Sequence, residues 1–492
     1  MKKRIPILTC FLVLILAVGA VLPACKKKEV PPKESSESMA TIEGDLFVPD
    51  DLPDRLPINH EKTKILGWEF TPNEFADSAS SDTIDEALWQ RVAHVESRLQ
   101  TTLDIKLTPG SNDHLDNFKS TVENSLHSGI GYDIIMQYSG FALIGATSGY
   151  YLDITDYPYV NFDKPWWPGN LQECITINDS AYFVSGDISV NCVEGMFAIL
   201  VNNDILRDYL FEDDPYQLAS DGNWTLDKMM GMANEVYTDL DSSGGKSEED
   251  EFGFVFINMV SIDAFLEGSD IQMVQRKNDG TLETDSGFVG EKTENLIDKL
   301  TGFISSDSVY VNTKYAAIFP EGRAMFMVGK LDTLIYWMKE SKFSFGVLPI
   351  PKYDLSQTGY KTTVNFNYSM FSIPKTAQDP AMMSAVLEAL ASEGYRTVNP
   401  AVFETAFKFQ YSESRTVSEM FDLILAGRSF DVGRLTMHQM ESNGLPSMVA
   451  SFRNITAGGT GAWGTVAPTY KKIWNGFLEK LPEQLKEKEN NS

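Results

Sequence analysis

The sequence predicts an α/β protein with more than one lobe, in which helices flank parallel or mixed sheets. The chain has 492 residues, too many for one ordinary domain, so two lobes are expected. Hydrophobic residues make up 43% and aromatic residues 11%, which is enough for large cores and too much for a disordered chain. Strand-like and helix-like stretches alternate after residue 62, and this alternation is typical of a parallel sheet covered by helices.

The first half of the chain supplies the clearest elements. Short apolar runs predict strands at Thr63–Trp68, Asp104–Leu107 and Tyr132–Met136, and amphipathic spacing predicts helices at Ile84–Leu99 and Asn117–Leu126. Ligands of open α/β sheets bind at the carboxyl ends of the strands. The residues just past two of these strands, Trp68-Glu69 and Gln137-Tyr138-Ser139, are therefore candidates for a binding site.

Later elements continue the pattern into a second lobe. Gly195–Asn202 predicts a strand that enters this lobe, and Thr225 is placed to cap the next helix, with Asp227 in its first turn. Further strands are predicted at Phe345–Pro349 and Met370–Pro374, and further helices at Pro380–Leu390, Ser418–Leu425 and Pro468–Leu478. No period of 20–50 residues repeats, which excludes solenoids and propellers.

The N-terminus predicts export. Basic residues 2–4 precede an apolar run over 5–21, and Leu22-Pro23-Ala24-Cys25 follows. This arrangement resembles a bacterial lipobox, so residues 1–24 are interpreted as a signal peptide and Cys25 as a lipidated mature N-terminus. The alternative is an uncleaved anchor helix. Residues 25–61, rich in Lys, Glu, Ser and Pro, are interpreted as a flexible tether.

Charge and cysteine content narrow the function classes. The formal charge is −28 and becomes more negative once residues 2–4 are removed, so nucleic acid and anionic lipid surfaces are not expected as partners. No second apolar run approaches the length of a membrane span. Cys174 and Cys192 either pair or remain as two buried thiols, and the sequence leaves both possibilities open, because it does not give the Cα separation.

Five segments together resemble the extracellular solute-binding proteins of ABC importers, in the family 1-like branch that binds sugars and oligosaccharides. These segments are Tyr132–Ile135, Val201–Leu206, Asp221–Thr225, Phe319–Phe326 and Phe345–Lys352. The resemblance covers the chain from about Thr63 onward. It implies a two-lobed periplasmic-binding-protein-like fold of type II, with a ligand cleft between the lobes and closure by hinge bending. It further implies lobe 1 at 62–195 plus 370–435 and lobe 2 at 196–369 plus 436–492.

A sugar site needs aromatic planes with polar groups beside them. The candidates for stacking are Trp68, Tyr138, Phe366, Tyr368 and Trp463, and those for hydrogen bonding are Glu69, Gln137, Ser139, Asp187, Asn365 and Asn367. Trp463 lies in a glycine-rich segment, 458–464, that suits an exposed platform. The alternative is that most of these aromatic side chains belong to the core, as we expect for Trp166, Trp167 and Trp224.

One acidic segment has the spacing of a calcium loop. Asp239, Asp241, Ser243 and Asp250 occupy ligand positions, although Ser243 and Asp250 depart from the usual residues, so a solvated acidic loop is the favoured interpretation. The five histidines have no zinc-ligand spacing, and no nucleophile elbow, phosphate loop or dinucleotide motif is present. No cofactor and no catalytic residue is expected.

The sequence thus predicts a monomeric, lipid-anchored substrate-binding protein on the extracytoplasmic face of a bacterial cell membrane. It would capture a carbohydrate between its lobes and deliver it to an ABC permease. The alternatives are a peptide- or signal-binding sensor lipoprotein and, less favoured, a surface polysaccharide hydrolase or lyase.

Overall fold

The computed structural model describes residues 48–58, 61–69, 74–128, 131–311, 317–338, 341–408 and 415–489. The predicted signal peptide, Cys25 and the first part of the predicted tether lie outside this range. Residues from Leu46 onward form one compact unit. Among the described residues, no helix combines the length and the apolar character that crossing a membrane requires.

The first sheet has the strand order β13-β3-β1-β2. Strand β1 pairs in parallel with both β2 and β3, whereas β13 runs antiparallel to β3. The carboxyl ends of β1 and β3 therefore lie at the same edge of the sheet. The bounds of the strands are β1 Lys62–Trp68, β2 Thr102–Thr108, β3 Ile134–Tyr138 and β13 Ser369–Ser372.

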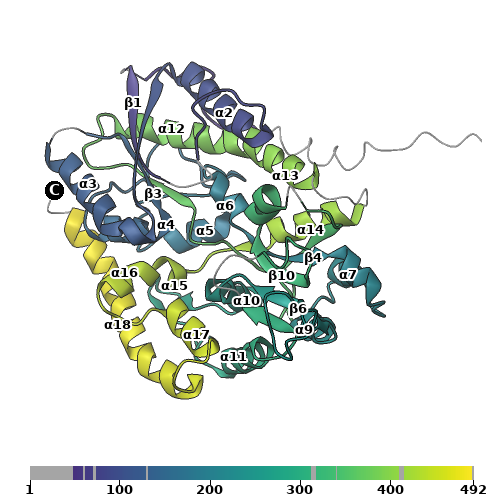
Figure 1. Ribbon diagram of the computed structural model, residues 1–492. Coiled ribbons are helices and arrows are strands. Elements are labelled where there is room, and N and C mark those ends of the chain that lie inside the picture. The colour runs from purple at the N-terminus through teal and green to yellow at the C-terminus, as the bar shows by residue number, and fades with distance from the viewer. Residues whose placement is uncertain are drawn as a thin grey trace, which may run out of the picture. The chain divides into compact units, whose positions relative to one another are not determined.

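Helices connect and cover this first sheet. Asp82 caps the first of them by accepting the backbone N–H groups of Ile84 and Asp85. Helix α12 packs along α2, as Figure 1 shows in its upper part. The elements are α2 Thr83–Leu99, η1 Asn112–His114, α3 Leu115–Ser128, α4 Ser139–Thr147, α5 Gly169–Ile175, α6 Val190–Glu194, α12 Pro380–Glu393, η4 Gly394–Val398 and α13 Asn399–Lys408.

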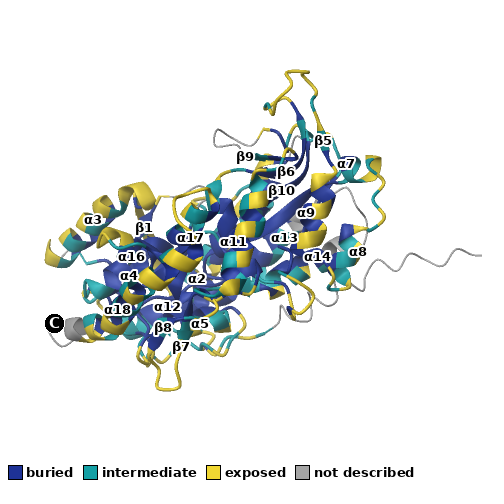
Figure 2. Ribbon diagram, turned by 90° about the horizontal axis from the view of Figure 1, so that it is seen from below, coloured by how far each residue is buried: buried dark blue, intermediate teal, exposed yellow. Residues whose placement is uncertain are grey.

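The second sheet has the order β11-β4-β10-β6-β5, with β9 also paired to β6. Strand β4 is buried along its whole length, as its continuous apolar run requires. Strands β6 and β10 are nearly so, as their dark blue colour in Figure 2 shows. The strands are β4 Phe197–Asn202, β5 Tyr237–Thr238, β6 Glu251–Phe256, β9 Val309–Val311, β10 Ala324–Lys330 and β11 Phe345–Leu348. A separate hairpin pairs β7 Val274–Arg276 with β8 Leu282–Thr284.

Helices around the second sheet include a segment that was assigned to the other lobe. Helix α14 packs against β11 and α8, although the sequence analysis placed its residues in lobe 1. Thr225 caps α9 as predicted, since its hydroxyl accepts the N–H of Lys228. The elements are α7 Asn203–Asp208, α8 Pro215–Ser220, α9 Leu226–Asn234, η2 Met259–Ile262, α10 Asp263–Gly268, α11 Glu291–Ile304, η3 Thr333–Trp337 and α14 Arg415–Ala426.

Two features link the sheets. A short parallel pair joins β12 Thr362–Thr363 to β14 Arg428–Ser429 between them. The C-terminal helices then contact both sides, because α16 packs on α4 while α17 packs on α11. These helices are α15 Val432–Leu435, α16 Met437–Ser442, α17 Met448–Thr456 and α18 Trp463–Glu489.

The structure decides two points about the start of the folded body and about the cysteines. The tether was predicted to run to Glu61, but from Val48 to Ile58 the chain is already docked, with Leu52 and Ile58 buried, so that boundary was placed too late. Cys174 and Cys192 are two free buried thiols, and the Cys174 thiol donates to the carbonyl oxygen of Phe430 at 3.2 Å. Burial raises the pKa of the Cys192 thiol to about 12.

Candidate functional site

The carboxyl end of β3 opens onto a run of aromatic rings. Tyr138, the last residue of β3, lies with its ring centroid 5.2 Å from that of Trp68 and 5.4 Å from that of His438. The ring of His438 in turn lies 5.3 Å from the ring of Phe366. The run therefore extends from the first sheet to the crossover, residues 364–368, and to α16. Its three predicted stacking residues are buried, with Trp68 2%, Tyr138 3% and Phe366 9% exposed, so none of them offers an open stacking face in this arrangement. The indole N–H of Trp68 already donates to the Ser369 hydroxyl at 2.8 Å.

A small cavity lies beside this run. Three predicted residues, Ser139, Phe366 and Tyr368, meet there, and the other lining residues are Val364, Ser429, Phe430, Asp431, Arg434 and Leu435. Its free volume is about 10 Å³, the lower limit of the space that one water molecule needs. The Ser139 hydroxyl donates to the carbonyl oxygen of Phe366 at 2.6 Å, which ties the first residue of α4 to the crossover. A ligand of sugar size therefore requires these walls to separate.

A cluster of buried ionic groups supports the wall that Arg434 forms. The Arg434 guanidinium lies 4.1 Å from the ring centroid of Phe366 and donates to the carbonyl oxygen of Val364 at 3.1 Å. It also contacts Glu267 at 3.1 Å and Asp263 at 3.4 Å, and Arg453 binds Asp263 as well. Burial raises the pKa of Glu267 to about 8. The N–H groups of Arg434 are thus engaged by Glu267, Asp263 and Val364. Since Glu267 is largely protonated at pH 7, the charged partner of Arg434 is Asp263, which it shares with Arg453.

His438 contributes a polar atom without a partner. Its Nε2 lies 3.4 Å from the Tyr138 hydroxyl, whereas its buried Nδ1 has no hydrogen-bond partner among the described residues. Burial, together with the charges of Arg434 and Arg453, lowers the pKa of His438 to about 4, so the imidazole is neutral at pH 7. A buried unpaired nitrogen costs about 1–3 kcal/mol, a cost that a ligand hydroxyl would relieve.

Other predicted residues fall into two groups. The fold already uses Gln137, whose amide donates to Ser372 at 2.7 Å and accepts from Tyr151, and Asp187, which pairs with Arg428 at 3.0 Å. Glu69 is exposed, and Asn365 and Asn367 are half-buried, so their side chains keep polar groups within reach of solvent.

Trp463 is not placed as the sequence analysis expected. It begins α18, is only 2% exposed, and donates its indole N–H to the carbonyl oxygen of Phe288 at 3.0 Å. Its ring packs edge-on against Phe288, with centroids 5.1 Å apart. The neighbouring glycines suggested a mobile platform, but the apolar surface of Phe288 and Trp474 receives the ring. We therefore remove Trp463 from the candidate site.

An aromatic pair beyond the end of β10 was not among the predicted site residues. Tyr336 and Trp337 close the π-helical turn η3 and are 37% and 49% exposed. Six of the eight tryptophans are at most 3% exposed, so Trp337 stands apart. The Tyr336 hydroxyl donates to the buried carboxylate of Glu194 at 3.1 Å. The available signal was position, since the pair closely follows a buried strand at its carboxyl end.

The acidic loop before β6 uses its carboxylates internally. Ligand atoms of Asp239, Asp241 and Asp250 lie within 4.8 Å of one another. Each of the three carboxylates accepts backbone N–H groups, with Gly244, Ser243 and Ser247 as donors at 3.0, 2.8 and 2.8 Å. The loop is largely exposed, as its colouring in Figure 2 shows. These bonds explain the three acidic residues as turn formers. The described residues offer no other cluster of candidate metal ligands, and nothing in this loop supports metal binding further.

A second hollow of about 360 Å³ lies elsewhere on the surface. It is lined by Asp51 and residues 158–163, none of which ends a strand of either sheet. The Asp51 carboxylate there is already bound by Lys164 at 2.7 Å. We therefore place the candidate site at the smaller cavity.

No family model and no curated protein sequence matches this chain. Its fold matches solved substrate-binding proteins. The cyclic α-maltosyl-1,6-maltose binding protein of Arthrobacter globiformis matches with a TM-score of 0.56 at 12% identity, over 86% of this chain and 100% of its own. An ABC substrate-binding protein of Listeria monocytogenes in complex with cycloalternan gives 0.53 at 12%, over 86% and 100%. UspC of M. tuberculosis gives 0.53 at 14%, over 84% and 99%.

At these identities the likeness concerns the fold. It confirms the predicted α/β fold of the two-lobed solute-binding proteins.

Proposed function

We propose that this protein is a lipid-anchored substrate-binding protein that captures a carbohydrate between its two sheets and delivers it to an ABC permease. The observation that supports this proposal most is the cavity at the end of β3, where aromatic rings converge with two serine hydroxyls, Asp431 and Arg434. Such a combination suits the apolar ring faces and hydroxyl rim of a sugar. The fold shared with sugar-binding proteins is consistent with it.

Each residue has a proposed part in binding. Phe366 offers a ring held in place by Arg434, and Ser139 and His438 offer hydroxyl and imidazole groups beside it. Asn365 and Asn367 add amide groups from the same crossover. Tyr336 and Trp337 would provide a second aromatic surface at the end of β10. The protein would act as a monomer, and none of these groups needs to react with the ligand.

Closure follows from the size of the cavity. At about 10 Å³ it has no room for a sugar ring, so ligand must enter while the walls are apart. The closed arrangement is then favoured by contacts that the ligand makes to both sides at once, because only a difference in affinity between two states shifts their equilibrium.

The proposed location rests on the N-terminal sequence. The signal-like residues 1–24 and Cys25 would place the protein on the extracytoplasmic face of the membrane. Anchoring there would keep a loaded protein close to its permease.

A ligand screen tests the proposal directly. We expect the purified chain to be stabilised by a subset of neutral mono- or oligosaccharides in a thermal-shift screen, with one-to-one binding by calorimetry. Phe366→Ala should weaken that binding about tenfold or more. Stabilisation by peptides alone would favour the sensor alternative, and turnover of an oligosaccharide would favour the hydrolase or lyase.

A further inference from the structure

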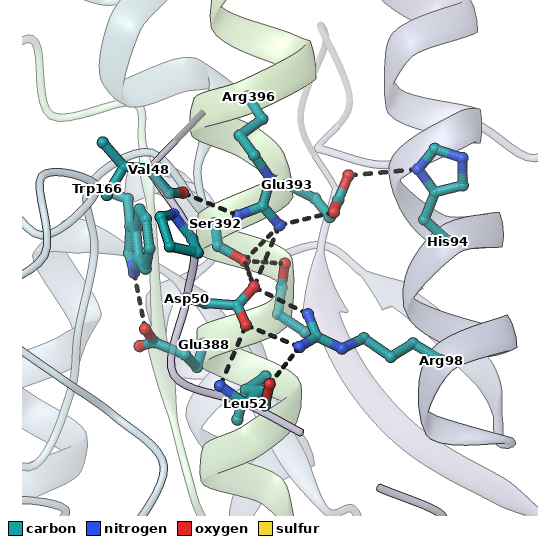
Figure 3. A network of polar contacts seen from close by, with 12 residues as sticks. Val48, Asp50, Leu52, His94, Arg98, Trp166, Glu388, Ser392, Glu393 and Arg396 are labelled. Carbon is teal, nitrogen blue, oxygen red and sulfur yellow. Dashed lines mark hydrogen bonds and ion pairs between the residues drawn. The ribbon is translucent and has the colours of Figure 1, made fainter. Parts of the chain in front are cut away.

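The first segment that the structure describes, Val48–Ile58, is fastened to the first sheet by a network around Asp50 (Figure 3). We call this segment the strap. The Asp50 carboxylate receives two parallel bonds from Arg98 of α2, both 2.8 Å long. It also receives a bond from the Ser392 hydroxyl at 3.0 Å and one from Arg396 at 3.2 Å. One carboxylate therefore bridges α2 to α12 and η4.

The backbone of the strap is bound as well. Arg98 donates to the carbonyl oxygens of Leu52 and Pro53 at 2.7 and 3.2 Å, and Arg396 donates to that of Val48 at 3.4 Å. Lys164 donates to the carbonyl oxygen of Pro49 at 2.9 Å. Three basic side chains from three different elements thus hold six consecutive residues, and the burial of Leu52 adds an apolar contact.

Asp50 is the residue on which this arrangement depends. Its side chain is only 4% exposed. Burial raises its pKa, but the bonds from Arg98, Ser392 and Arg396 outweigh that effect and lower the pKa to about 2. Glu393 balances part of the positive charge of the two guanidinium groups, since its carboxylate pairs with Arg396 at 2.7 Å. Loss of Asp50 would leave two neighbouring guanidinium groups short of one carboxylate, and a bidentate Arg–carboxylate pair is among the strongest polar contacts.

We propose that the strap is a clasp that joins the preceding chain to the helices of the first sheet and that can release without unfolding the rest of the protein. Its polar contacts lie on α2, α12, η4 and the segment around Lys164. Of its apolar side chains, Leu52 and Ile58 are buried, whereas Val48 and Leu56 are half-buried. Segments with few buried side chains open locally at lower free energy than a core does.

The clasp has a consequence for the tether, which rests on the proposed anchor at Cys25. The seated strap removes residues 48–58 from the free length of the tether. At roughly 3.3–3.6 Å for each residue, release would lengthen the reach by at most about 36–40 Å. An anchor upstream would then hold the first sheet while the strap is seated, and the second sheet would be the one left to move.

Proteolysis of the full chain tests the clasp without sugar or membrane, so its outcome is independent of the proposed function. Arg55 lies exposed within the strap, and trypsin needs that segment free to cleave after it. We expect Asp50→Ala to accelerate cleavage after Arg55 at least tenfold, with Asp50→Asn between it and the unaltered chain. Asp54→Ala removes an exposed carboxylate from the same strap and should change the rate less than twofold.

Two results would overturn the proposal. Equal cleavage rates for Asp50→Ala and Asp54→Ala would mean that Asp50 does not hold the strap. Cleavage within α2 or α18 that accelerates in parallel would mean that the strap does not release on its own. Mass spectrometry of the fragments separates these cases.

Discussion

Trp463 and Trp337 show how differently two aromatic side chains from turn regions are used. Trp463 follows a glycine-rich stretch and is 2% exposed, with its indole N–H bonded to Phe288. Trp337 ends a π-helical turn and is 49% exposed, with no ring contact among the described residues. The composition of a loop therefore does not decide the fate of its aromatic residue. The presence of apolar surface that can receive the ring decides it.

The largest expected effect is on the buried member of the comparison. Trp463→Ala should lower the free energy of unfolding by about 3–5 kcal/mol, because it leaves a cavity between Phe288 and Trp474 and removes a buried hydrogen bond. Urea unfolding of the variant measures this. Leu355→Ala, at a side chain 68% exposed, is the matched control and should have little effect. Unchanged stability with weakened sugar binding would return Trp463 to the site.

A second, smaller effect on stability is expected where buried tryptophans hydrogen-bond a buried carboxylate. Trp166 and Trp167 donate their indole N–H groups to the buried carboxylate of Glu388 at 3.1 and 2.8 Å. Burial raises the pKa of Glu388 from 4.5 to about 7. An unfolded chain releases this proton above pH 4.5 while the folded chain keeps it to about pH 7. Stability from this group is therefore full below pH 4.5 and is lost as the pH rises to 7.

The loss should amount to about 1–3 kcal/mol. Glu388→Gln removes the titration, so the difference in unfolding free energy between pH 4.5 and pH 8 should shrink by that amount. Other buried carboxylates titrate in the same direction, including Glu267 and Asp431, and they are common to both proteins. An identical pH dependence in the variant would contradict the assignment to Glu388.

Much of the fold could be predicted because its signals are local. The continuous apolar run of β4, the amphipathic spacing of α2 and the cap at Thr225 each specify an element without reference to the rest of the chain. Helix α14 shows the limit of such local signals. Its pattern predicts a helix, but its packing on β11 depends on tertiary contacts that the pattern does not contain.

The candidate site was predicted only in part, because it too depends on tertiary contacts that local sequence patterns do not contain. The rule on strand ends found Ser139, which lines the cavity, and Tyr138, whose ring packs against His438. It would also have found Tyr336 and Trp337 had it been applied to β10. It did not distinguish Gln137, whose side chain alternates to the other face and binds Ser372 and Tyr151. Arg434 and His438 come from helices far along the chain, and no local spacing joins them to β3.

The smallest expected change in stability concerns the exposed member of the comparison, where affinity is the informative quantity. Trp337→Ala should change the free energy of unfolding by less than about 0.5 kcal/mol, because half of the ring is already in water. If a sugar ring stacks there, affinity should fall about tenfold, equivalent to about 1.4 kcal/mol, and Trp337→Phe should retain most of it. Calorimetry with a sugar found in the screen measures both variants.

Bound sugar should also protect indole fluorescence from quenching by acrylamide, since six other indoles are already shielded from solvent. Sugar binding that survives Trp337→Ala unchanged would leave the proposed function intact but would show that exposure at a strand end does not by itself mark a binding residue.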